Sequence, residues 1–326
     1  MREPKFWYQS NGLSSTLLAP LGRLYYSVGV CRRLITRPLT LDCPVICVGN
    51  ATIGGAGKTP VTDLLATTLA QAGYRPAILS RGYGGSLSGP VRVSDTHQAI
   101  DVGDEPCLLA QRHPVYIGAD RRETARYALA EGHDVLLLDD GYQNPALSYD
   151  LRILVVDGLR GFGNGRLIPA GPLREPWRNA VARADIVVVN HGQPTPDLVD
   201  VCDRRQIPLV VAHIQPKAPQ PKPVYAYCGI ANPDKFTRSL DEAGYDIRGT
   251  WFFDDHYAYS EMDARMLIGE ASKRDARLIT TEKDASRLKG AGGLRQALLS
   301  ASDVFEIQLS TEPDLTAAVQ HALSRL

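Results

Sequence analysis

A glycine-rich loop between an apolar strand and a helix is the feature that most constrains how this chain folds. Residues 44–50 form an apolar run typical of a buried strand, and residues 59–72 have helical periodicity. Glycines let successive backbone N–H groups turn inward around a phosphate, and the positive end of the following helix strengthens the attraction. The sequence therefore predicts a loop that binds nucleotide phosphates. The residues expected to bind the nucleotide are Thr52, Ile53, Gly54, Gly55, Ala56, Gly57, Lys58 and Thr59.

The last two residues of this loop carry the predicted chemistry. Lys58 is expected to reach the β- and γ-phosphates, and the hydroxyl of Thr59 to coordinate Mg²⁺. The strict P-loop pattern has a glycine five residues before Gly57, where this chain has Thr52. The Gly-Lys-Thr run between a strand and a helix still favours nucleotide binding over an ordinary glycine-rich turn.

A second buried strand, over residues 133–140, ends in two acids. Four apolar residues precede Asp139 and Asp140. In P-loop folds the end of such a strand lies beside the phosphate loop, where a carboxylate can hold Mg²⁺ directly or through water. Adjacent acids at a strand end can also cap a helix. The phosphate loop upstream favours the metal role.

The alternation of strands and helices indicates the fold class. Continuous apolar strands separated by helices are typical of a parallel sheet covered on both faces. Further strands are expected at residues 76–80, 150–157 and 185–190. A Pro/Lys/Gln-rich stretch over residues 215–223 has the composition of a linker. After it we expect strands at 224–228, 247–253, 277–281 and 304–309, and helices at 233–243, 260–273 and from 312 onward.

The length of 326 residues is enough for two domains, each with its own core. We predict an α/β fold with a P-loop kinase-like parallel sheet domain over residues 41–215 and a smaller α/β domain over residues 222–326. The 36 Lys+Arg and 36 Asp+Glu residues give a formal net charge of zero, which argues against general nucleic-acid binding. The six cysteines have neither zinc spacing nor a disulfide framework, which favours reduced thiols in a cytosolic protein.

Residues 1–40 form an N-terminal segment with an unusual composition. Residues 6–22 carry no charge, yet polar residues interrupt the apolar ones too often for a membrane-spanning helix or a signal peptide. Leucines at roughly helical spacing are followed by several arginines. A basic amphipathic segment with aromatic residues can lie in the interface of an anionic membrane. A terminal helix packed on the protein's own core is the other interpretation, and this segment by itself slightly favours it.

The glycine-rich segment 161–178 contains three arginines, at positions 166, 174 and 178, and a single acid, Glu175. Arginines on a loop beyond a strand end are suited to stabilising a transferring phosphoryl group or binding an anionic substrate. A solvated surface loop does not usually concentrate arginine and glycine in this way. We therefore expect this loop to take part in the site.

Two further segments offer acid–base groups. Asp104 precedes a predicted helix and can act as its cap, while His256 stands at the start of a helix in the second predicted domain. A lone histidine is more often structural than catalytic. A kinase, however, needs a carboxylate to accept the proton of the substrate hydroxyl. Asp104 with His256 across an interdomain cleft would supply such a pair.

A GTPase is disfavoured among P-loop proteins. Its guanine-reading motif, Asn-Lys-x-Asp, is expected after a late strand of the sheet. Here the strand at residues 185–190 ends in Asn190 and continues with His191, Gly192 and Gln193, so the lysine and the aspartate are missing.

Taken together, the sequence resembles the tetraacyldisaccharide 4′-kinases, the lipid A kinase family of Gram-negative bacteria. The resemblance runs from the N-terminal segment to about residue 288, and the family shares the missing first glycine of the phosphate loop. One departure is that Tyr142 and Asn144 replace the phenylalanine and histidine common in the family, so Asn144 is given no role in proton transfer. The motifs in chain order are VGNATIGGAGKTP (48–60), LSRGYGG (79–85), GDEP (103–106), DDGYQ (139–143), GPLRE (171–175), DH (255–256) and TEKD (281–284).

The resemblance implies two α/β/α domains with the active site in the cleft between them. It implies phosphorylation, by ATP with Mg²⁺, of the 4′-hydroxyl of a tetraacylated glucosamine disaccharide 1-phosphate, which gives the lipid A precursor lipid IVA. A substrate with four acyl chains stays in the bilayer. The resemblance therefore reverses the interpretation of residues 1–40, which are expected to dock the enzyme peripherally on the cytoplasmic face of the inner membrane.

The resemblance also implies roles for individual residues. Asp104 is the expected base on the substrate hydroxyl, with His256 orienting or tuning it. Two cations are expected to stabilise the γ-phosphoryl group, namely Lys58 and Arg174. Three residues are expected to arrange the magnesium ion, namely Thr59, Asp139 and Glu175.

Two other functions remain open from the sequence. One is a P-loop kinase of a soluble sugar or nucleoside, which the amphipathic N-terminal segment disfavours. The other is a non-enzymatic nucleotide switch, which leaves Asp104, His256 and the arginine-rich loop without a role.

Overall fold

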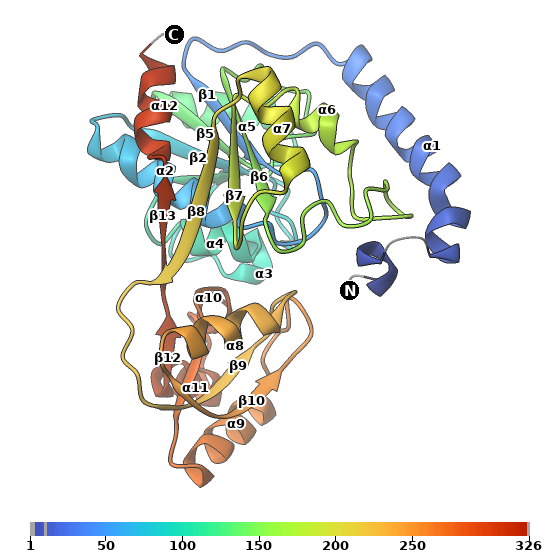
Figure 1. Ribbon diagram of the computed structural model, residues 1–326. Coiled ribbons are helices and arrows are strands. Elements are labelled where there is room, and N and C mark those ends of the chain that lie inside the picture. The colour runs from blue at the N-terminus through green and yellow to red at the C-terminus, as the bar shows by residue number, and fades with distance from the viewer. Residues whose placement is uncertain (1–3, 10–11, 325–326) are drawn as a thin grey trace.

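In the computed structural model, which describes residues 4–9 and 12–324, the chain forms two parallel-dominated sheets, one above the other in Figure 1. The strands of the larger sheet are β1 (Val45–Gly49), β2 (Pro76–Ser80), β3 (Val91–Arg92), β4 (Val115–Ile117), β5 (Val135–Asp139), β6 (Leu151–Asp157), β7 (Ile186–Asn190), β8 (Leu209–Pro216) and β13 (Ile307–Glu312). The central strands of the larger sheet are apolar and buried, as expected for a sheet with helices on both faces, whereas β3, β8 and β13 are only partly buried.

Within the described residues this larger sheet has nine strands in the order β13-β8-β7-β6-β1-β5-β2-β4-β3. Its interior is parallel, and only the two edge strands β3 and β13 run antiparallel to their neighbours. The predicted α/β fold with a parallel sheet is confirmed. Because β1 lies between β5 and β6, the loop after β1 leaves the sheet next to the ends of both strands.

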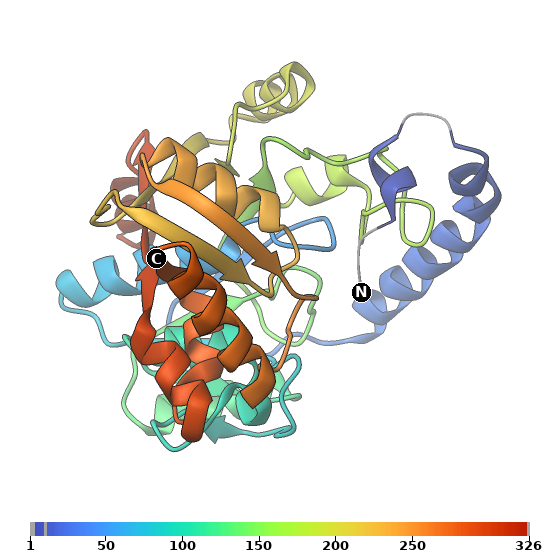
Figure 2. The same ribbon diagram turned by 90° about the horizontal axis from the view of Figure 1, so that it is seen from below.

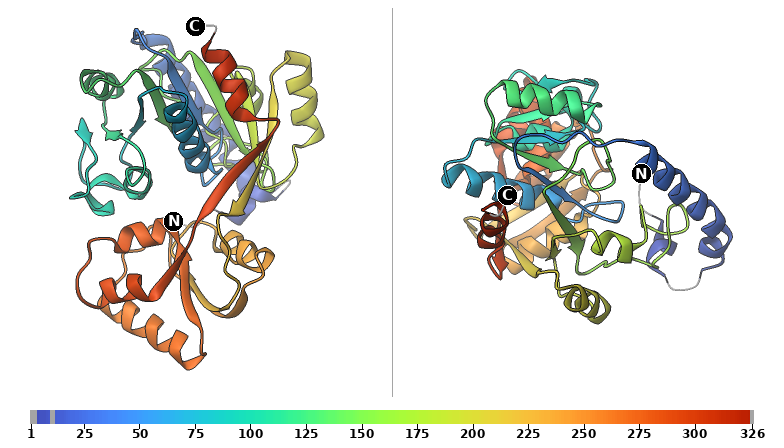
Figure 3. Two further views of the ribbon diagram at one scale, coloured as in Figure 1. Left: turned by 90° about the vertical axis from the view of Figure 1, so that its left-hand side faces the viewer. Right: turned by 90° about the horizontal axis from the view of Figure 1, so that it is seen from above.

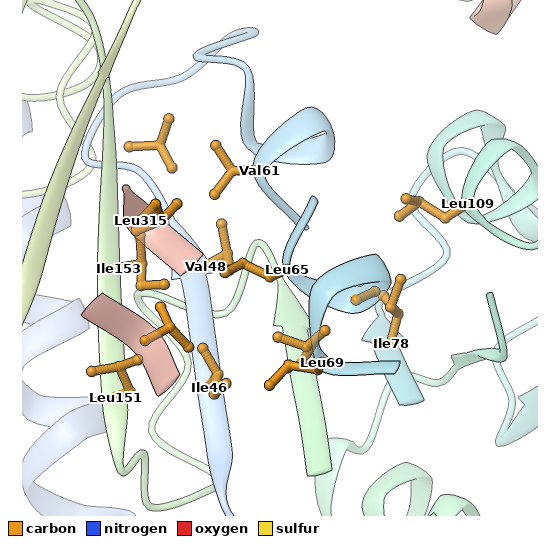
Figure 4. Close-up of a cluster of buried hydrophobic side chains, with 14 of the residues drawn as sticks. Ile46, Val48, Val61, Leu65, Leu69, Ile78, Leu109, Leu151, Ile153 and Leu315 are labelled. Atoms are coloured by element: carbon orange, nitrogen blue, oxygen red, sulfur yellow. The ribbon is translucent and has the colours of Figure 1, made fainter. Parts of the chain in front are cut away.

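Helices cover both faces of the larger sheet. One face packs against α2 (Lys58–Gln71), α4 (Asp104–Leu109) and α12 (Leu315–Leu323), and Figure 4 shows Leu65 and Leu315 among Val48 and Ile153 of the sheet. The other face packs against α5 (Arg121–Ala130), α6 (Trp177–Val181) and α7 (Pro196–Arg205). The remaining helices before β9 are η1 (Lys5–Tyr8), α1 (Leu13–Ile35) and α3 (Ala99–Val102).

The smaller sheet is built from β9 (Pro223–Cys228), β10 (Asp246–Phe252), β11 (Arg277–Thr281) and β12 (Ser302–Phe305). The strands are parallel and have the order β10-β9-β11-β12. The helices that pack against this sheet are α8 (Pro233–Glu242), α9 (Glu261–Lys273), α10 (Glu282–Leu288) and α11 (Gly293–Ala301).

The C-terminal segment differs from the expectation of one strand at 304–309. Two strands occupy this region: β12 ends the smaller sheet, and β13 returns to pair with β8 at the edge of the larger one. Residues from Ile307 onward therefore belong to the larger sheet, although the sequence placed them in the smaller domain. The structure differs because Leu315 and Val319 fill the core beside α2, which a strand count along the sequence does not reveal.

Two antiparallel strands connect the sheets. β8 extends to Pro216, so the linker is shorter than the predicted 215–223, and Gln215 of β8 is paired with Gln308 of β13. Figure 3 shows these two strands running side by side from the upper to the lower part of the molecule. The chain thus crosses between the sheets twice, at adjacent positions.

Candidate active site

The glycine-rich loop lies between β1 and α2, as predicted. Lys58 Nζ donates to Asn50 Oδ1 at 3.3 Å, and Asn50 Nδ2 donates to Thr52 Oγ1 at 3.3 Å. Gly57 has a φ of 81°, a left-handed conformation that favours glycine. A Cβ atom there would lie 2.4 Å from Asn190 Nδ2, so the close approach of Asn190 also requires a glycine at this position.

Asn190 at the end of β7 fastens the loop. Its Nδ2 donates to the carbonyl oxygens of Ala56 and Gly57 at 2.9 and 3.0 Å. The sequence analysis used this residue only to argue against a guanine-reading motif. Its role in holding the loop depends on β7 lying two strands from β1, which the sequence did not predict.

The arginine-rich loop lies against the phosphate loop. Ile53 N donates to Pro172 O at 2.8 Å, and Arg174 N donates to Ala51 O at 2.8 Å. These backbone contacts bring the side chain of Arg174 to the predicted phosphate site. Of the three arginines in this loop, Arg166 instead donates to Ser15 O of α1, and Arg178 forms an exposed ion pair with Asp197.

Asp140 lies between the two cations predicted to stabilise the γ-phosphoryl group. Its carboxylate accepts from Arg174 Nη1 at 2.9 and 3.1 Å and lies 3.6 Å from Lys58 Nζ. Burial alone would raise the pKa of Asp140, but the charges of Lys58 and Arg174 hold it below its ordinary value. Lys58 and Arg174 therefore share one anion, as they would share a phosphoryl group.

Asp139 is fully buried at the end of β5. Its Oδ1 accepts from Thr62 Oγ1 at 3.3 Å, while its Oδ2 has no hydrogen-bond partner among the described residues. Burial and the negative charge of Glu105 raise the pKa of Asp139 to about 7. An orphaned, buried carboxylate oxygen of this kind suits a bound cation.

The donor set fits a magnesium ion. Thr62 lies one turn beyond Thr59, so the first turn of α2 and the Asp139 carboxylate are adjacent. Over residues 4–9 and 12–324 no group of three or more His, Cys, Asp or Glu side chains could hold a metal. A magnesium ion does not require three such side chains, because it is usually bound through one or two carboxylates together with phosphate oxygens and water.

Glu175 is fully buried, and its carboxylate is paired with the arginine Arg183 and the amide of Gln143. Its two carboxylate oxygens accept from Arg183 Nη2, each at 2.8 Å, and Gln143 Nε2 donates to it at 3.1 Å. Gln143 Oε1 in turn accepts from Arg174 at 3.3 Å. In this structure Glu175 supports the position of Arg174, and its predicted role at the metal stays a prediction.

The structure brings Asp104 and His256 together. Asp104 is the first residue of α4, with Gly103 rather than Asp104 as the cap, and its Oδ2 accepts from His256 Nδ1 at 2.6 Å. The sequence predicts His256 at the start of a helix, and this prediction is wrong. His256 lies in a turn between β10 and α9, with a φ of 59°, because α9 begins only at Glu261 after a Ser260 cap.

Arg287 of α10 is, with Asn190, a residue whose place in the site the sequence analysis missed. Its Nε donates to Asp104 Oδ2 at 2.8 Å, and Nη2 donates to the same oxygen. Burial acts to raise the pKa of Asp104, but the hydrogen bonds from His256 and Arg287 lower it to about 2. The available signal was the helical spacing of Arg287 from Asp284, the last residue of the TEKD motif.

A second ion pair joins the same two helices. Lys283 Nζ of α10 donates to Glu105 Oε1 of α4 at 2.8 Å. The charge of Lys283 holds the pKa of Glu105 below its ordinary value, and the charge of Lys58 acts in the same direction. The charge of Lys58 in the phosphate loop therefore acts on Glu105, the residue that follows Asp104.

The helix α1 stands to one side of the larger sheet and contacts the arginine-rich loop (Figures 1 and 2). Gly22 packs on this loop so closely that a Cβ would lie 2.9 Å from Leu167 O, and Asn179 Nδ2 donates to the Tyr26 hydroxyl at 3.0 Å. Trp7 of η1 is buried and donates to Pro169 O at 3.0 Å. The two buried residues of this helix, Ser15 and Gly22, are small, and the half-buried ones include both Tyr26 and the apolar Leu18 and Val30.

The outward side of α1 is apolar. At about 100° per residue, six of its exposed apolar side chains fall within roughly 80° of one another, opposite Gly22 and Tyr26, while Leu34, which is also exposed, lies outside this arc. We call these six residues the α1 stripe, and each is 53–85% exposed: Leu13, Leu17, Leu21, Leu24, Val28 and Ile35. Among the helices that the structure describes, none is long and apolar enough to cross a membrane.

Comparison with known proteins gives a consistent result. A family model described as tetraacyldisaccharide-1-P 4′-kinase matches residues 14–324. A tetraacyldisaccharide 4′-kinase of Parvibaculum lavamentivorans is 44% identical, covering 100% of this chain and 99% of that protein. One from Jannaschia sp. is 45% identical, covering 88% of this chain and 90% of that protein.

A solved structure is similar over nearly the whole chain. It is the "apo" form of LpxK from Aquifex aeolicus in complex with ATP, with 25% sequence identity and a TM-score of 0.75. The match covers 95% of this chain and 98% of that one. The likeness therefore includes both sheets and the strands that connect them.

Proposed function

This chain belongs to the tetraacyldisaccharide-1-P 4′-kinase family, and from that membership we propose how its own residues carry out the transfer. The enzyme is an ATP-dependent lipid kinase that phosphorylates the 4′-hydroxyl of a tetraacylated glucosamine disaccharide 1-phosphate. The observation that carries the proposed mechanism is the arrangement at α4, where the Asp104 carboxylate accepts a hydrogen bond from His256 at 2.6 Å.

Lys58 and Arg174 bind the γ-phosphoryl group in this proposal. Both cations already contact one carboxylate, that of Asp140, so their positive ends are directed to a common point. Phosphoryl transfer depends mainly on positioning and on neutralising charge over the phosphoryl oxygens. The phosphate-loop backbone, held by Asn190, positions the nucleotide beside them.

Thr59 and Asp139 would hold the magnesium ion, through the hydroxyl and the orphaned Oδ2 respectively. The bound ion supplies positive charge to the phosphate oxygens.

Asp104 accepts the proton of the acceptor hydroxyl, and His256 orients its carboxylate. An ionised carboxylate is a weak base when its pKa is about 2. The loose transition state of phosphoryl transfer needs little activation of the nucleophile, so alignment of an ionised carboxylate suffices.

The α1 stripe is proposed to lie in the membrane surface, on the cytoplasmic face of the inner membrane. Its support is the arrangement of α1, with Gly22 packed against the protein and the six apolar residues of the stripe exposed. Such a helix buries its apolar face in the interfacial region of a bilayer, where a four-chain lipid resides.

The test measures transfer of labelled phosphate from ATP to a tetraacyl disaccharide 1-phosphate in detergent micelles. We expect transfer by the wild type and a loss of about 10²–10⁴-fold in Lys58→Ala and in Asp104→Ala. Lys217→Ala, which removes only an exposed partner of Glu306, should retain wild-type activity. Transfer that survives Asp104→Ala would require a different base, and transfer only to soluble sugars would overturn the lipid substrate.

A further inference from the structure

Arg287 lies between two carboxylates and is almost completely buried. Its Nε and Nη2 donate to Asp104 Oδ2, and its Nη1 donates to Asp284 Oδ1 at 2.7 Å and to Gly229 O at 2.6 Å. Its side chain is 6% exposed. Each nitrogen of the guanidinium group thus has a fixed acceptor, which is the arrangement that favours arginine over lysine.

Asp284 is a rigid support for this guanidinium group. It is fully buried, and its Oδ1 also accepts from Gly229 N at 2.9 Å and from the Tyr259 hydroxyl at 2.8 Å. Its Oδ2 accepts from Thr281 Oγ1 at 2.6 Å. The position of Arg287 is therefore set by the core of the smaller sheet and not by Asp104.

The two oxygens of Asp104 have different surroundings. Oδ2 accepts three hydrogen bonds, one from His256 and two from Arg287. No donor within the described residues is seen to reach Oδ1. The oxygen left for a substrate hydroxyl is therefore Oδ1, and the orientation that leaves it available is set from the smaller sheet.

We propose that Arg287 is a positioning residue for phosphoryl transfer, and that it holds the Asp104 carboxylate ionised with Oδ1 directed to the acceptor hydroxyl. Asp284 anchors Arg287 in this role. The inference rests on the proposed function of Asp104 as the base, and it adds a residue from the smaller sheet that does not touch the substrate. The hydroxyl proton passes to Oδ1 as the oxygen–phosphorus bond forms and the bond to ADP breaks.

The charges around Asp104 determine what the loss of Arg287 would do. His256 faces Asp104 from the turn after β10, and Arg287 and Lys283 face it from α10. Asp255 lies 3.6 Å from His256 and favours its charged form. Burial opposes the ionisation of Asp104. Without Arg287, the ionised carboxylate loses one of the two hydrogen-bond partners that offset this effect, and it can rotate.

The first experiment measures transfer to the tetraacyl disaccharide 1-phosphate as a function of pH for Arg287→Gln and Arg287→Lys. For Arg287→Gln we expect kcat to fall about 100-fold, because the base is misplaced, while KM for ATP stays within about twofold of wild type. The acid limb of its pH profile should move upward by about one unit or more, because an adjacent arginine lowers a carboxyl pKa by about 1–3 units.

Arg287→Lys separates charge from geometry. Lysine restores the positive charge without the planar set of donors, so the acid limb should return toward wild type while kcat stays low. Arg295→Gln is the matched control, because it removes a half-exposed arginine of α11 that lies 3.6 Å from Glu261. Wild-type kcat and an unmoved acid limb in Arg287→Gln would overturn the inference.

A second measurement is independent of turnover. The carboxyl ¹³C signal of Asp104, followed by NMR through an acid titration, should give a pKa of about 2 in the wild type and a higher one in Arg287→Gln. Equal values would overturn the inference. If Arg287→Gln loses the native amide spectrum, the kcat of Arg287→Lys decides instead, and a wild-type kcat in that variant would overturn the inference. If the wild type fails to phosphorylate the lipid, the proposed function fails, whereas this titration still decides whether Arg287 controls Asp104.

Discussion

Three aspartates near the phosphate loop have different charge states because their neighbours differ. Burial raises the pKa of Asp139 to about 7, with Glu105 nearby, while Lys58 and Arg174 lower that of Asp140. Asp104, paired with His256 and Arg287, has a pKa of about 2. Divergent environments of this kind would let one residue type fill the proposed roles of base, charge partner and metal ligand.

His256 gives a testable pH dependence of stability. Its hydrogen bond to Asp104 raises its pKa above the ordinary value against the effect of burial, so the folded protein favours the charged form. The contribution of protonated His256 to the free energy of unfolding is fully present below the pKa of histidine in the unfolded chain, about 6.5. It is lost as the pH rises through the higher pKa of His256 in the folded protein. His256→Gln should therefore lower the free energy of unfolding more at low pH than at high pH.

Urea unfolding near pH 6 and pH 9 measures this difference. The side chain of His256 is 48% exposed, so solvent screening limits the effect to about 1 kcal/mol or less. His321→Gln, at the last turn of α12, is the control. An equal destabilisation by His256→Gln at both pH values would contradict the prediction.

At the scale of the element, α1 is a helix with its amphipathicity inverted. A helix packed on its own protein normally buries its leucines. Here Gly22 faces the arginine-rich loop, Tyr26 accepts from Asn179 of α6, and the α1 stripe faces outward. The same loop supplies Arg174 to the phosphate site, so α1 and the site are joined by one segment.

Substitutions in the α1 stripe should weaken binding to lipid vesicles. Leu17→Glu with Leu21→Glu removes two apolar side chains and adds two charges. At about 1.5–3 kcal/mol per buried leucine, the affinity for vesicles containing anionic phospholipid should fall about 100-fold or more. Sedimentation with vesicles measures the affinity, and binding of ATP should be unchanged.

Met262→Glu is the control for charge and exposure. Met262 is 80% exposed on α9 of the smaller sheet, away from α1. Its substitution should leave vesicle binding unaltered. Wild-type vesicle binding by the double variant of α1 would exclude the stripe as the membrane contact.

At the scale of the whole molecule, the C-terminal segment closes the larger sheet. After the smaller sheet is complete, β13 pairs with β8 and α12 packs beside α2, the helix that carries Thr59. The smaller sheet is therefore an insertion between two strands of the larger one. Its position relative to Asp104 is set by two adjacent crossings and by the ion pairs of α10 with α4.

Leu315→Ala tests this closure. Leu315 is fully buried in the core of the larger sheet, so its truncation should lower the free energy of unfolding by about 2–5 kcal/mol. Gln320→Ala, on the exposed side of the same helix, should have little effect. Urea unfolding measures both, and a near-neutral Leu315→Ala would indicate that α12 does not stabilise the sheet.

The sequence by itself determined the local features of this protein. The phosphate loop, the buried strands and the acids at the end of β5 could be predicted, because glycine conformation, apolar runs and helix ends depend on neighbouring residues. The pairing of Asp104 with His256 was inferred from the need for an acid–base pair, and the resemblance to a known family added the expected role of each residue. Each of these signals is carried by a few adjacent residues or by a motif in fixed order.

Only the tertiary structure decided which distant residues meet. Arg287 and Asp104 are 183 positions apart, and nothing local to either indicates the other. The return of β13 to the larger sheet and the outward direction of the α1 stripe are likewise set by packing between elements, since many segments of similar pattern compete for the same neighbours. The sequence thus specified the chemical groups, and the fold determined which of them share one charge environment.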